Sequence, residues 1–249
     1  MSDLAGKVAL VTGGAGGLGT AICERLAAAG ASVVVGYNRS RVPAEALAAR
    51  LPSPDRHAAL PAPVTDSEAL ADLASEIRRR YGRLDLLVNC AGTTRFVAHD
   101  DLDGLDDALI DEILATNVRG PFACVRALHS LLKGSGAGVV VNITSIAATT
   151  AMGSNVMYCA SKAAVDNMTR SLARALAPTV RVVSVAPGLT DTEFVKNLEQ
   201  EWRNEQAART PLQRLANPEE VAAAVFAVAT HLTFTTGAII PVDGGRPLA

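Results

Sequence analysis

The chain has 249 residues, which is enough to bury a large core and fits a single domain. Apolar residues make up 49% of it, and 23 basic against 25 acidic residues leave a formal net charge of −2. Such a balance gives no general attraction to nucleic acid or to an anionic membrane. No segment approaches the roughly 20 apolar residues that a membrane-spanning helix needs.

The four cysteines and four histidines are scattered along the sequence. Their spacing matches neither a disulfide scaffold nor a metal-binding motif, so we expect no metal. The residues from Met1 to Lys7 lack the basic region and apolar run of a signal peptide. We therefore expect a cytoplasmic protein with reduced thiols.

Short apolar runs rich in valine and isoleucine alternate with longer helical segments. The runs show little polar alternation, which is typical of parallel strands buried on both faces. We expect strands at residues 8–11, 33–35, 84–88, 139–143, 180–185 and 238–242, with a weaker one at 57–60. Helices are predicted at residues 18–29, 67–81 and 163–177, and from Pro218 to about Thr230. This alternation predicts an α/β fold, a Rossmann-like doubly wound parallel sheet with helices on both faces, in one domain over residues 1–249.

One long segment, residues 190–216, interrupts this alternation. It is polar, carries charges of both signs and contains the only tryptophan, Trp202. Because it follows the carboxyl end of a predicted strand, we expect it to form a lid over a binding site.

A glycine-rich turn joins the first predicted strand to the first helix. Gly13, Gly17, Leu18 and Gly19 lie in this turn. Glycines let the backbone approach a pyrophosphate closely, and the helix N-terminus offers free N–H groups and a positive dipole. The position between a buried strand and a helix favours dinucleotide binding over a purely structural turn.

The end of the second predicted strand carries Asn38, Arg39 and Ser40 and no acidic residue. An acid there would bind the ribose 2′-hydroxyl and repel a 2′-phosphate. Arg39 or Arg41 could pair with a phosphate instead, so the sequence favours NADP(H) over NAD(H).

Tyr158 and Lys162 are four residues apart in a segment with helical character. On a helix this spacing places both side chains on one face. A nearby ammonium and an oxidised nicotinamide would both favour a tyrosine phenolate, which suits acid–base chemistry. The pair alone is more often structural.

Further motifs occur in a fixed order around this pair. They are the glycine-rich turn, Asn89-Cys90-Ala91-Gly92, Asn117, Ser145 and Pro187-Gly188. With them, the chain from Lys7 to Gly245 resembles the short-chain dehydrogenase/reductase family, in its compact single-domain branch. The overall resemblance, which includes the segment Val242-Asp243-Gly244-Gly245, is greatest to 3-oxoacyl-(acyl-carrier-protein) reductases.

The resemblance implies roles for four catalytic residues. Tyr158 would protonate the carbonyl oxygen, and Lys162 would hold the nicotinamide ribose and favour the phenolate. Ser145 would hydrogen-bond the substrate oxygen, and Asn117 would hold a water that links Lys162 to solvent. Asn117 could also serve a local helix distortion that its own side chain satisfies.

The resemblance and the turn residues together assign the cofactor contacts, and the resemblance also implies a homotetramer. We expect the cofactor to contact Gly13, Gly17, Leu18, Gly19, Asn38, Arg39, Ser40, Val64, Asn89, Ala91, Gly92, Tyr158, Lys162, Pro187, Gly188, Thr190 and Thr192. Substrate choice is expected to depend on Phe96, Val97, Met152, Asn155, Phe194, Leu198 and Trp202.

Three departures from the family pattern bear on the ligands. Pro63 stands where many members have an aspartate for adenine, so recognition would use the Val64 backbone, Thr65 or water. Gly16 stands where many NADP(H)-using members have a basic residue. The turns at residues 134–137 and 177–179 lack the charges that often receive an acyl carrier protein, and only Lys133 is nearby.

The sequence thus predicts an NAD(P)-dependent oxidoreductase that interconverts a ketone and a secondary alcohol, and reduction of a 3-oxoacyl thioester is one candidate reaction. A dehydrogenase of sugars, steroids or other small alcohols is the alternative within enzymes. A non-catalytic nucleotide-sensing protein is the alternative outside them, but such a protein would be expected to lose Tyr158 or Lys162.

Overall fold

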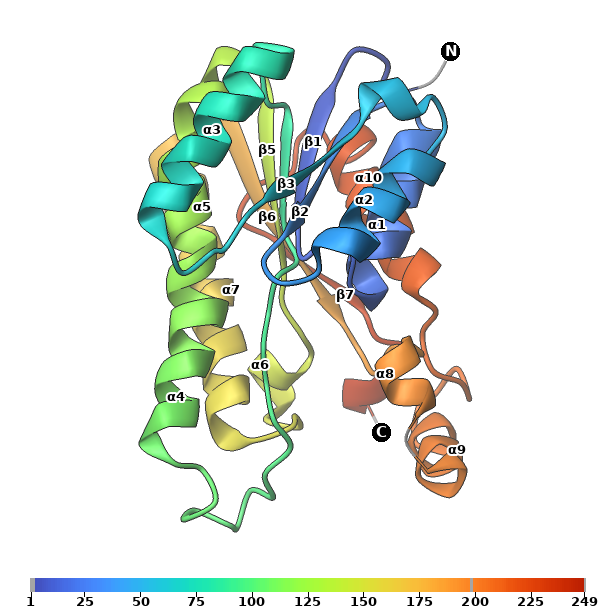
Figure 1. Ribbon diagram of the computed structural model, residues 1–249. Helices are drawn as coiled ribbons and strands as arrows, with labels where there is room; N and C mark the ends of the chain where they lie inside the picture. The colour runs from blue at the N-terminus through green and yellow to red at the C-terminus, as the bar shows by residue number, and fades with distance from the viewer. Residues whose placement is uncertain (1–2, 198, 249) are drawn as a thin grey trace.

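A parallel sheet of seven strands forms the centre of the computed structural model, which describes residues 3–197 and 199–248 (Figure 1). The order of the strands is β3-β2-β1-β4-β5-β6-β7. All seven expected strands, including the weaker one, are confirmed: β1 Val8–Thr12, β2 Ser32–Tyr37, β3 Ala58–Pro61, β4 Leu86–Asn89, β5 Gly138–Ile143, β6 Val180–Pro187 and β7 Ile239–Val242.

Helices cover both faces of the sheet (Figure 1). One face carries α1 Gly17–Ala28, α2 Arg41–Arg50 and α10 Pro218–Thr230. The other carries α3 Ser67–Tyr81, α5 Gly120–Gly134 and α7 Val156–Leu176, with α4 Asp107–Leu114 continuing α5 through the π-helical turn η2 Ala115–Arg119. Shorter helices are η1 Pro54–Arg56, α6 Ala147–Thr150, α8 Glu193–Lys196, α9 Gln200–Ala208 and η3 Arg246–Leu248.

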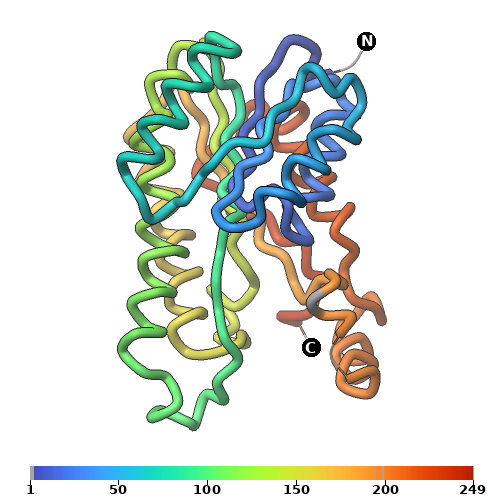
Figure 2. The backbone as a smooth tube through the Cα atoms, in the orientation of Figure 1, coloured from blue at the N-terminus to red at the C-terminus, as the bar shows by residue number. Residues whose placement is uncertain are grey.

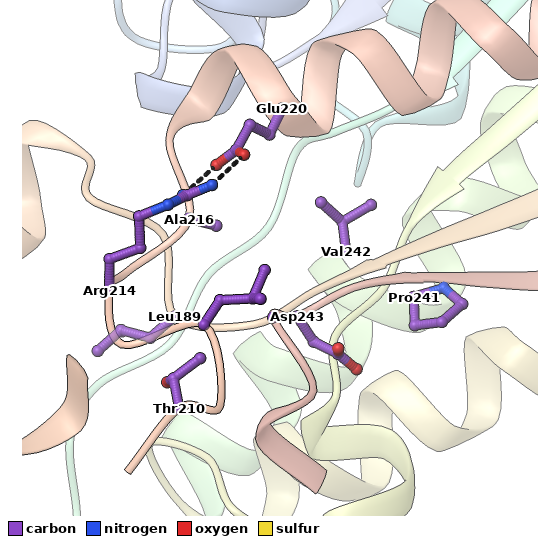
Figure 3. Close-up of a pocket in the computed structure, with 10 residues that line it drawn as sticks. Leu189, Thr210, Arg214, Ala216, Glu220, Pro241, Val242 and Asp243 are labelled. Carbon is purple, nitrogen blue, oxygen red and sulfur yellow. Dashed lines mark hydrogen bonds and ion pairs between the residues drawn. The ribbon is translucent and has the colours of Figure 1, made fainter. Parts of the chain in front are cut away.

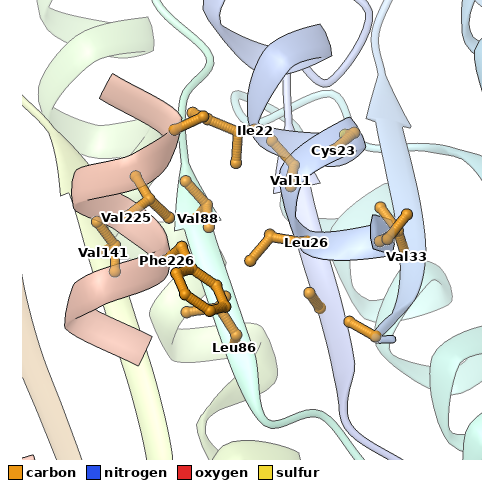
Figure 4. Packing of buried hydrophobic residues seen from close by; sticks show 14 of the residues in the cluster. Val11, Ile22, Cys23, Leu26, Val33, Leu86, Val88, Val141, Val225 and Phe226 are labelled. Carbon is orange, nitrogen blue, oxygen red and sulfur yellow. The ribbon is translucent and has the colours of Figure 1, made fainter. Parts of the chain in front are cut away.

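The core explains why the strands show no polar alternation. Successive residues of a strand point to opposite faces, and here both faces are covered. Val11, Val88 and Val141 pack against α1 and α10, as Figure 4 shows, whereas Leu10 and Leu87 belong to the cluster on the other face. Burial on both sides therefore selects apolar residues at most strand positions, and the buried polar exceptions lie mainly toward the carboxyl ends of the strands.

Local capping chemistry sets the helix ends much as expected. Helix α3 begins after Asp66, whose carboxylate accepts hydrogen bonds from the N–H groups of Glu68 and Ala69, and it ends at Gly82 with φ +71°. Helix α10 has a capping box formed by Asn217 and Glu220. Helix α1 begins at Gly17, one residue before the expected start, because Gly16 is the N-cap.

The fourth strand is shorter than expected because the side chain of Asp85 binds neighbouring residues before the strand begins. Its carboxylate accepts hydrogen bonds from the Val8 N–H at 3.0 Å and from Arg83 at 2.6 and 2.8 Å, and it pairs with Lys7 at 3.1 Å. Residues 84–85 therefore tie the amino ends of β1 and β4 together, and pairing with β1 begins at Leu86.

The strand order reverses direction at β1, which pairs with β2 on one side and β4 on the other. In doubly wound sheets this switch point, at the carboxyl ends of the strands, is where ligands bind. Helices α8 and α9 and the segment between β4 and α4 extend beyond that edge (Figure 2). Among the described residues, no helix has the length and apolar character to cross a membrane.

Candidate active site

The glycine-rich turn is built for close backbone contacts. Gly13 has φ +62°, and a Cβ there would lie 3.0 Å from the Ala91 Cα. A Cβ on Gly19 would lie 2.8 Å from the Gly14 Cα and closer still to the Gly13 carbonyl oxygen. Gly17, exposed at the first turn of α1, leaves backbone N–H groups open toward solvent. The turn therefore has the close backbone packing and the free helix N-terminus that an anion-binding site needs, and its binding of a phosphate stays a prediction.

Thr12, which sequence reasoning missed, fixes the second loop of the switch point. Its hydroxyl oxygen accepts hydrogen bonds from the N–H groups of Cys90 and Ala91, each at 3.1 Å. The residue is fully buried at the end of β1. Its position directly before Gly13 was the only available signal. Thr12 thus holds the segment Asn89 to Gly92 against the glycine-rich turn.

Asn89 faces into the sheet rather than toward solvent. Its Nδ2 donates to Asn142 Oδ1 at 2.9 Å, and Asn142 Nδ2 donates to Thr169 Oγ1 at 2.8 Å. Thr169 in turn shares a hydrogen bond with Ser184 at 2.8 Å. This buried polar chain links β4, β5, α7 and β6, so the Asn89 Nδ2 group joins strand ends, whereas its buried Oδ1 has no hydrogen-bond partner.

Tyr158 and Lys162 lie on one face of α7, as the spacing predicted. Lys162 Nζ is 5.5 Å from the centroid of the Tyr158 ring. The ammonium is buried, with the residue 8% exposed, and it donates to the Ile143 carbonyl oxygen at 3.0 Å. This single protein acceptor leaves donor capacity on the ammonium for a ligand beside the tyrosine.

Asn117 lies in the π-helical turn η2, which confirms the expected helix distortion. Its Oδ1 accepts from the Thr93 N–H at 2.8 Å, and its Nδ2 donates to the Thr93 carbonyl at 2.9 Å and to Ser161 Oγ at 3.2 Å. A Cβ on Gly92 would lie 3.4 Å from Asn117 Oδ1 and 3.9 Å from Lys162 Nζ. The structure therefore gathers Asn117, Gly92 and Lys162 at one point.

Ser145 follows β5 and begins the turn into α6. Its Oγ accepts a hydrogen bond from the Ala147 N–H at 3.1 Å, which leaves the hydroxyl proton to donate elsewhere. A Cβ on Gly153 would lie 3.1 Å from Ala147 Cβ and 3.0 Å from Tyr158 Cδ1. The turn that carries Ser145 thus packs beside the tyrosine ring.

The end of β6 leads directly into the long excursion. Gly188 N donates to the Val242 carbonyl at 2.9 Å, and the Ile146 N–H donates to the Pro187 carbonyl at 3.0 Å. Thr190 and Ala216 then pair in an isolated parallel bridge. The first and last residues of the segment 190–216 are therefore held side by side, which is compatible with the expected lid.

The excursion also touches the glycine-rich turn. A Cβ on Gly17 would lie 2.9 Å from Thr192 Cβ, so the two residues are in direct contact. Around them a hollow of about 420 Å³ lies between α1, α8 and the start of α10.

Arg203 on α9 pairs with Asp191 at 2.7 Å, with their side chains only 18% and 26% exposed. This ion pair, which sequence reasoning missed, fastens α9 to the residue next to Thr192.

A smaller hollow of about 260 Å³ lies at the base of the excursion (Figure 3). Leu189 and Asp243 line it, and Arg214 binds Glu220 in a two-pronged ion pair at 2.6 and 2.7 Å. The Arg214 guanidinium, helped by the Asn217 N–H, lowers the pKa of Glu220 to about 2. Tyr158 does not line this hollow, so its residues stabilise the base of the excursion rather than the reaction site.

The end of β2 presents Asn38, Arg39 and Ser40 as exposed residues. Arg41, the other arginine expected to meet a phosphate, forms an ion pair with Glu45 at 2.8 Å. Within the described residues Arg39 forms no ion pair, so it is the guanidinium free for a ligand. The Val64 side chain is buried against Gly120, and the contact of its backbone with adenine stays a prediction.

The residues expected to choose the substrate divide into two groups. Phe96, Met152 and Trp202 are 78%, 44% and 37% exposed and remain available to a ligand. Val97 and Asn155 are buried, at 6% and 1% exposure, and therefore do not fit direct substrate contact. Leu198 and the Phe194 side chain lie outside the described residues.

The cysteine in the segment Asn89 to Gly92 has a raised pKa. Burial raises the pKa of the Cys90 thiol to about 11, against a smaller opposing effect of the Lys162 charge. Burial likewise raises the pKa of Cys124 to about 12. Both thiols are therefore protonated at neutral pH, which makes them weak nucleophiles.

These features fit a nicotinamide dinucleotide. Gly13 and Gly17 let the turn pack directly against Ala91 and Thr192, and the first N–H groups of α1, which have no partner within the helix, lie in this turn and suit a pyrophosphate. Lys162 retains donor capacity beside Tyr158 at the same edge of the sheet. The donor set of this edge therefore suits phosphate and ribose groups.

Comparison with known proteins agrees with this geometry. Residues 13–246 match the family model described as enoyl-(acyl carrier protein) reductase. The chain is 41% identical to a Streptomyces violaceoruber protein named as ketoacyl reductase 2 of the granaticin polyketide synthase, over 97% of this chain and 96% of that protein. It is 37% identical to cis-4-hydroxycyclohexanecarboxylate dehydrogenase of Sinomonas cyclohexanicum, over 96% of each chain.

A solved structure is similar as well. The short-chain dehydrogenase/reductase titled glucose/ribitol dehydrogenase from Brucella melitensis superposes with a TM-score of 0.90, at 31% identity and 98% coverage of both chains. Fold, strand order and sequence identity all agree. The chain therefore belongs to the short-chain dehydrogenase/reductase family and is an NAD(P)-dependent oxidoreductase.

Proposed function

We propose that this protein is an NADP(H)-dependent ketoreductase that converts the ketone of a 3-oxoacyl thioester into a secondary alcohol. The observation that carries the proposal is the buried Lys162 ammonium 5.5 Å from the Tyr158 ring, at the carboxyl edge of the sheet. When bound, the reduced nicotinamide supplies a hydride to the carbonyl carbon.

Side chains of the protein bind the carbonyl oxygen of the substrate and supply the proton that it receives. Tyr158 gives its phenolic proton to the carbonyl oxygen, and the neighbouring Lys162 charge stabilises the phenolate that remains. Ser145 donates its free hydroxyl proton to the same oxygen, where negative charge develops. Asn117 lies in the π-helical turn near Lys162 and would hold the water that links this lysine to solvent.

The preference for NADP(H) rests on Arg39. It is exposed directly after β2, and no acidic residue occupies residues 38–40. Arg41 is engaged with Glu45, so Arg39 provides the guanidinium for a 2′-phosphate. Asn38 and Ser40 are exposed beside it and would offer further side-chain donors to the phosphate.

The substrate class rests on the relatives. Ketoacyl reductase is the name of the relative at 41% identity, and its length matches this chain almost fully. The relative named as a hydroxycyclohexanecarboxylate dehydrogenase favours a second candidate, oxidation of a small cyclic hydroxy acid. Both reactions use the same tyrosine, lysine and serine and differ in direction and in substrate shape.

We further propose a homotetramer. Phe122 on α5 and Val156 on α7 are 44% and 42% exposed, and Phe234 before β7 is fully exposed. Exposed apolar side chains on the long helices and near the last strand suit contacts between subunits. Light scattering of the purified protein tests this assembly.

A substrate panel tests the proposed reaction. The nicotinamide absorbance is followed with NADPH and acetoacetyl thioesters, diketones and sugars, and with NADP and hydroxycyclohexane carboxylates. Reduction of the 3-oxoacyl thioesters with the highest kcat/KM is the expected result. A higher kcat/KM for the hydroxy acid would replace the first candidate by the second.

A further inference from the structure

We infer that Asn155 is a positioning residue of this reaction, which fixes the segment at residues 94–97 relative to Tyr158. The inference rests on the proposed function, because it concerns the same site. Sequence position alone assigned Asn155 to substrate contact. Its 1% exposure and its three side-chain hydrogen bonds instead indicate a role in positioning the segments that it joins.

One end of the Asn155 amide holds the catalytic helix. Asn155 is the N-cap of α7, and its Oδ1 accepts a hydrogen bond from the Tyr158 N–H at 2.6 Å. The N-cap residue normally anchors the first turn of its helix in this way. Here that first turn contains Tyr158 itself, so the cap sets the backbone position of the residue that carries the phenol.

The other end of the amide holds the segment that follows β4. Asn155 Nδ2 donates to the Arg95 carbonyl at 2.8 Å and to Thr94 Oγ1 at 3.2 Å. Both amide protons are therefore used, and the acceptor faces the Tyr158 N–H. A reversed amide would place donors against a donor and an acceptor against a carbonyl, so the network permits only one orientation.

Neighbouring contacts continue this attachment along both segments. Thr94 and Ser154 share a hydrogen bond between their hydroxyls at 2.5 Å, and the Val97 N–H donates to the Ser154 carbonyl at 2.9 Å. Phe96, 78% exposed, lies within the attached segment. Asn155 thus couples the phenol to a wall where an exposed aromatic side chain is available to a substrate.

The requirement for asparagine follows from its two kinds of atoms. An aspartate caps a helix as well as an asparagine does. Asp66 does so for α3, accepting from Glu68 and Ala69 at 3.0 and 3.1 Å without donating anything. Only an amide can cap α7 and donate to Thr94 and Arg95 together.

Substitutions at Asn155 can separate the capping oxygen of the amide from its two N–H donors. Asn155→Asp keeps the cap and removes both donors, and Asn155→Ala removes the cap and the donors. Asp66→Ala is the matched control, because the cap that it removes binds the N–H groups of Glu68 and Ala69, and neither of these residues is assigned to the site. Stability, cofactor Kd, kcat, KM and amide hydrogen exchange at residues 94–97 are measured for all three in the full-length protein.

Asn155→Ala is expected to lower kcat/KM about tenfold or more, since small misplacements of reacting groups are costly. Cofactor Kd is expected to stay within about twofold, because the amide meets no part of the cofactor cradle. Asn155→Asp is expected to recover kcat in part while the ketone KM stays raised and exchange at Val97 quickens. Asp66→Ala is expected to lower only the stability.

Wild-type kcat, KM and Val97 exchange in Asn155→Asp would overturn the inference, whether or not Asn155→Ala folds. So would an Asn155→Ala protein that loses stability as Asp66→Ala does and keeps wild-type kinetics. If the wild-type protein reduces no ketone, the proposed function fails instead. The exchange measurement still decides whether Asn155 couples the two segments.

Discussion

Thr192 lies directly against Gly17, so closely that a Cβ on Gly17 would come within 2.9 Å of Thr192 Cβ and Cγ2. Gly17 opens α1 at the glycine-rich turn, and Thr192 belongs to the excursion at residues 190–216. This contact places the proposed pyrophosphate-binding turn directly against the proposed lid. The absence of a side chain at Gly17 is what permits it.

Gly17→Ala is therefore expected to weaken cofactor binding. The added methyl group must displace Thr192 or the turn, and we expect the NADPH Kd to rise about tenfold, or about 1.4 kcal/mol. Fluorescence titration measures it. Gly134→Ala is the control, since a Cβ there meets nothing within 4 Å. An unchanged Kd in Gly17→Ala would show that Thr192 can move without affecting the cradle.

Arg39→Asp is expected to reverse the cofactor preference. A carboxylate after β2 would repel a 2′-phosphate and accept a hydrogen bond from a free 2′-hydroxyl. The ratio of kcat/KM for NADPH to that for NADH should fall about a hundredfold or more, since both effects act together. Arg41→Ala, which removes a guanidinium already paired with Glu45, should change the ratio little. A wild-type protein that prefers NADH would contradict this assignment.

The Arg203–Asp191 ion pair is expected to keep α9 attached to the residue next to Thr192. Its side chains are mostly buried, so the pair is less screened than a surface pair. Arg203→Ala and Asp191→Asn should each lower kcat/KM by about fivefold, and the double variant should lose little more, because the two changes remove one interaction. Steady-state kinetics of the four proteins measures the coupling. Additive losses would mean that the residues act separately.

The fold was predictable because its signals are local or repetitive. Valine-rich runs such as 139–143 need only burial on both faces, and Asp66 and Gly82 set the ends of α3 through neighbouring backbone groups. Tyr158 and Lys162 were brought together as their spacing predicted. Their catalytic roles, like the cofactor contacts, stay predictions.

Contacts between distant segments could not be predicted. The Thr12 hydroxyl binds the loop after β4, and Arg203 meets Asp191, only because the sheet and the excursion bring them together. Asn155 showed the opposite error. Its position beside the tyrosine suggested substrate contact. In the structure the residue is buried, and its side-chain amide forms hydrogen bonds with three other residues.

Asp85 gives a prediction for acid stability. Burial raises the pKa of its carboxyl, but Arg83, the Val8 N–H and Lys7 together outweigh burial, and the net pKa is lowered. Because the folded value is the lower one, the stabilisation is complete above the usual aspartate pKa of about 3.9 and is lost as the pH falls through the folded value.

Asp85→Asn is therefore expected to lower the free energy of unfolding by about 2 kcal/mol at neutral pH, since hydrogen bonds to a charged group are lost. The difference from wild type should shrink below about pH 4. Urea unfolding at several pH values measures it, with the exposed Asp55→Asn as control. A difference that stays constant across this pH range would contradict the role of the Asp85 charge.

The central claim is that Tyr158 transfers the proton while neighbouring groups hold the cofactor and the substrate oxygen. Tyr158→Phe removes one hydroxyl and keeps the ring that packs beside Gly153. With NADPH and a 3-oxoacyl thioester, kcat should fall by a factor of about 10³ or more, with the NADPH Kd close to the wild-type value. A Tyr158→Phe protein that retains wild-type kcat on a substrate of the native protein would contradict the account.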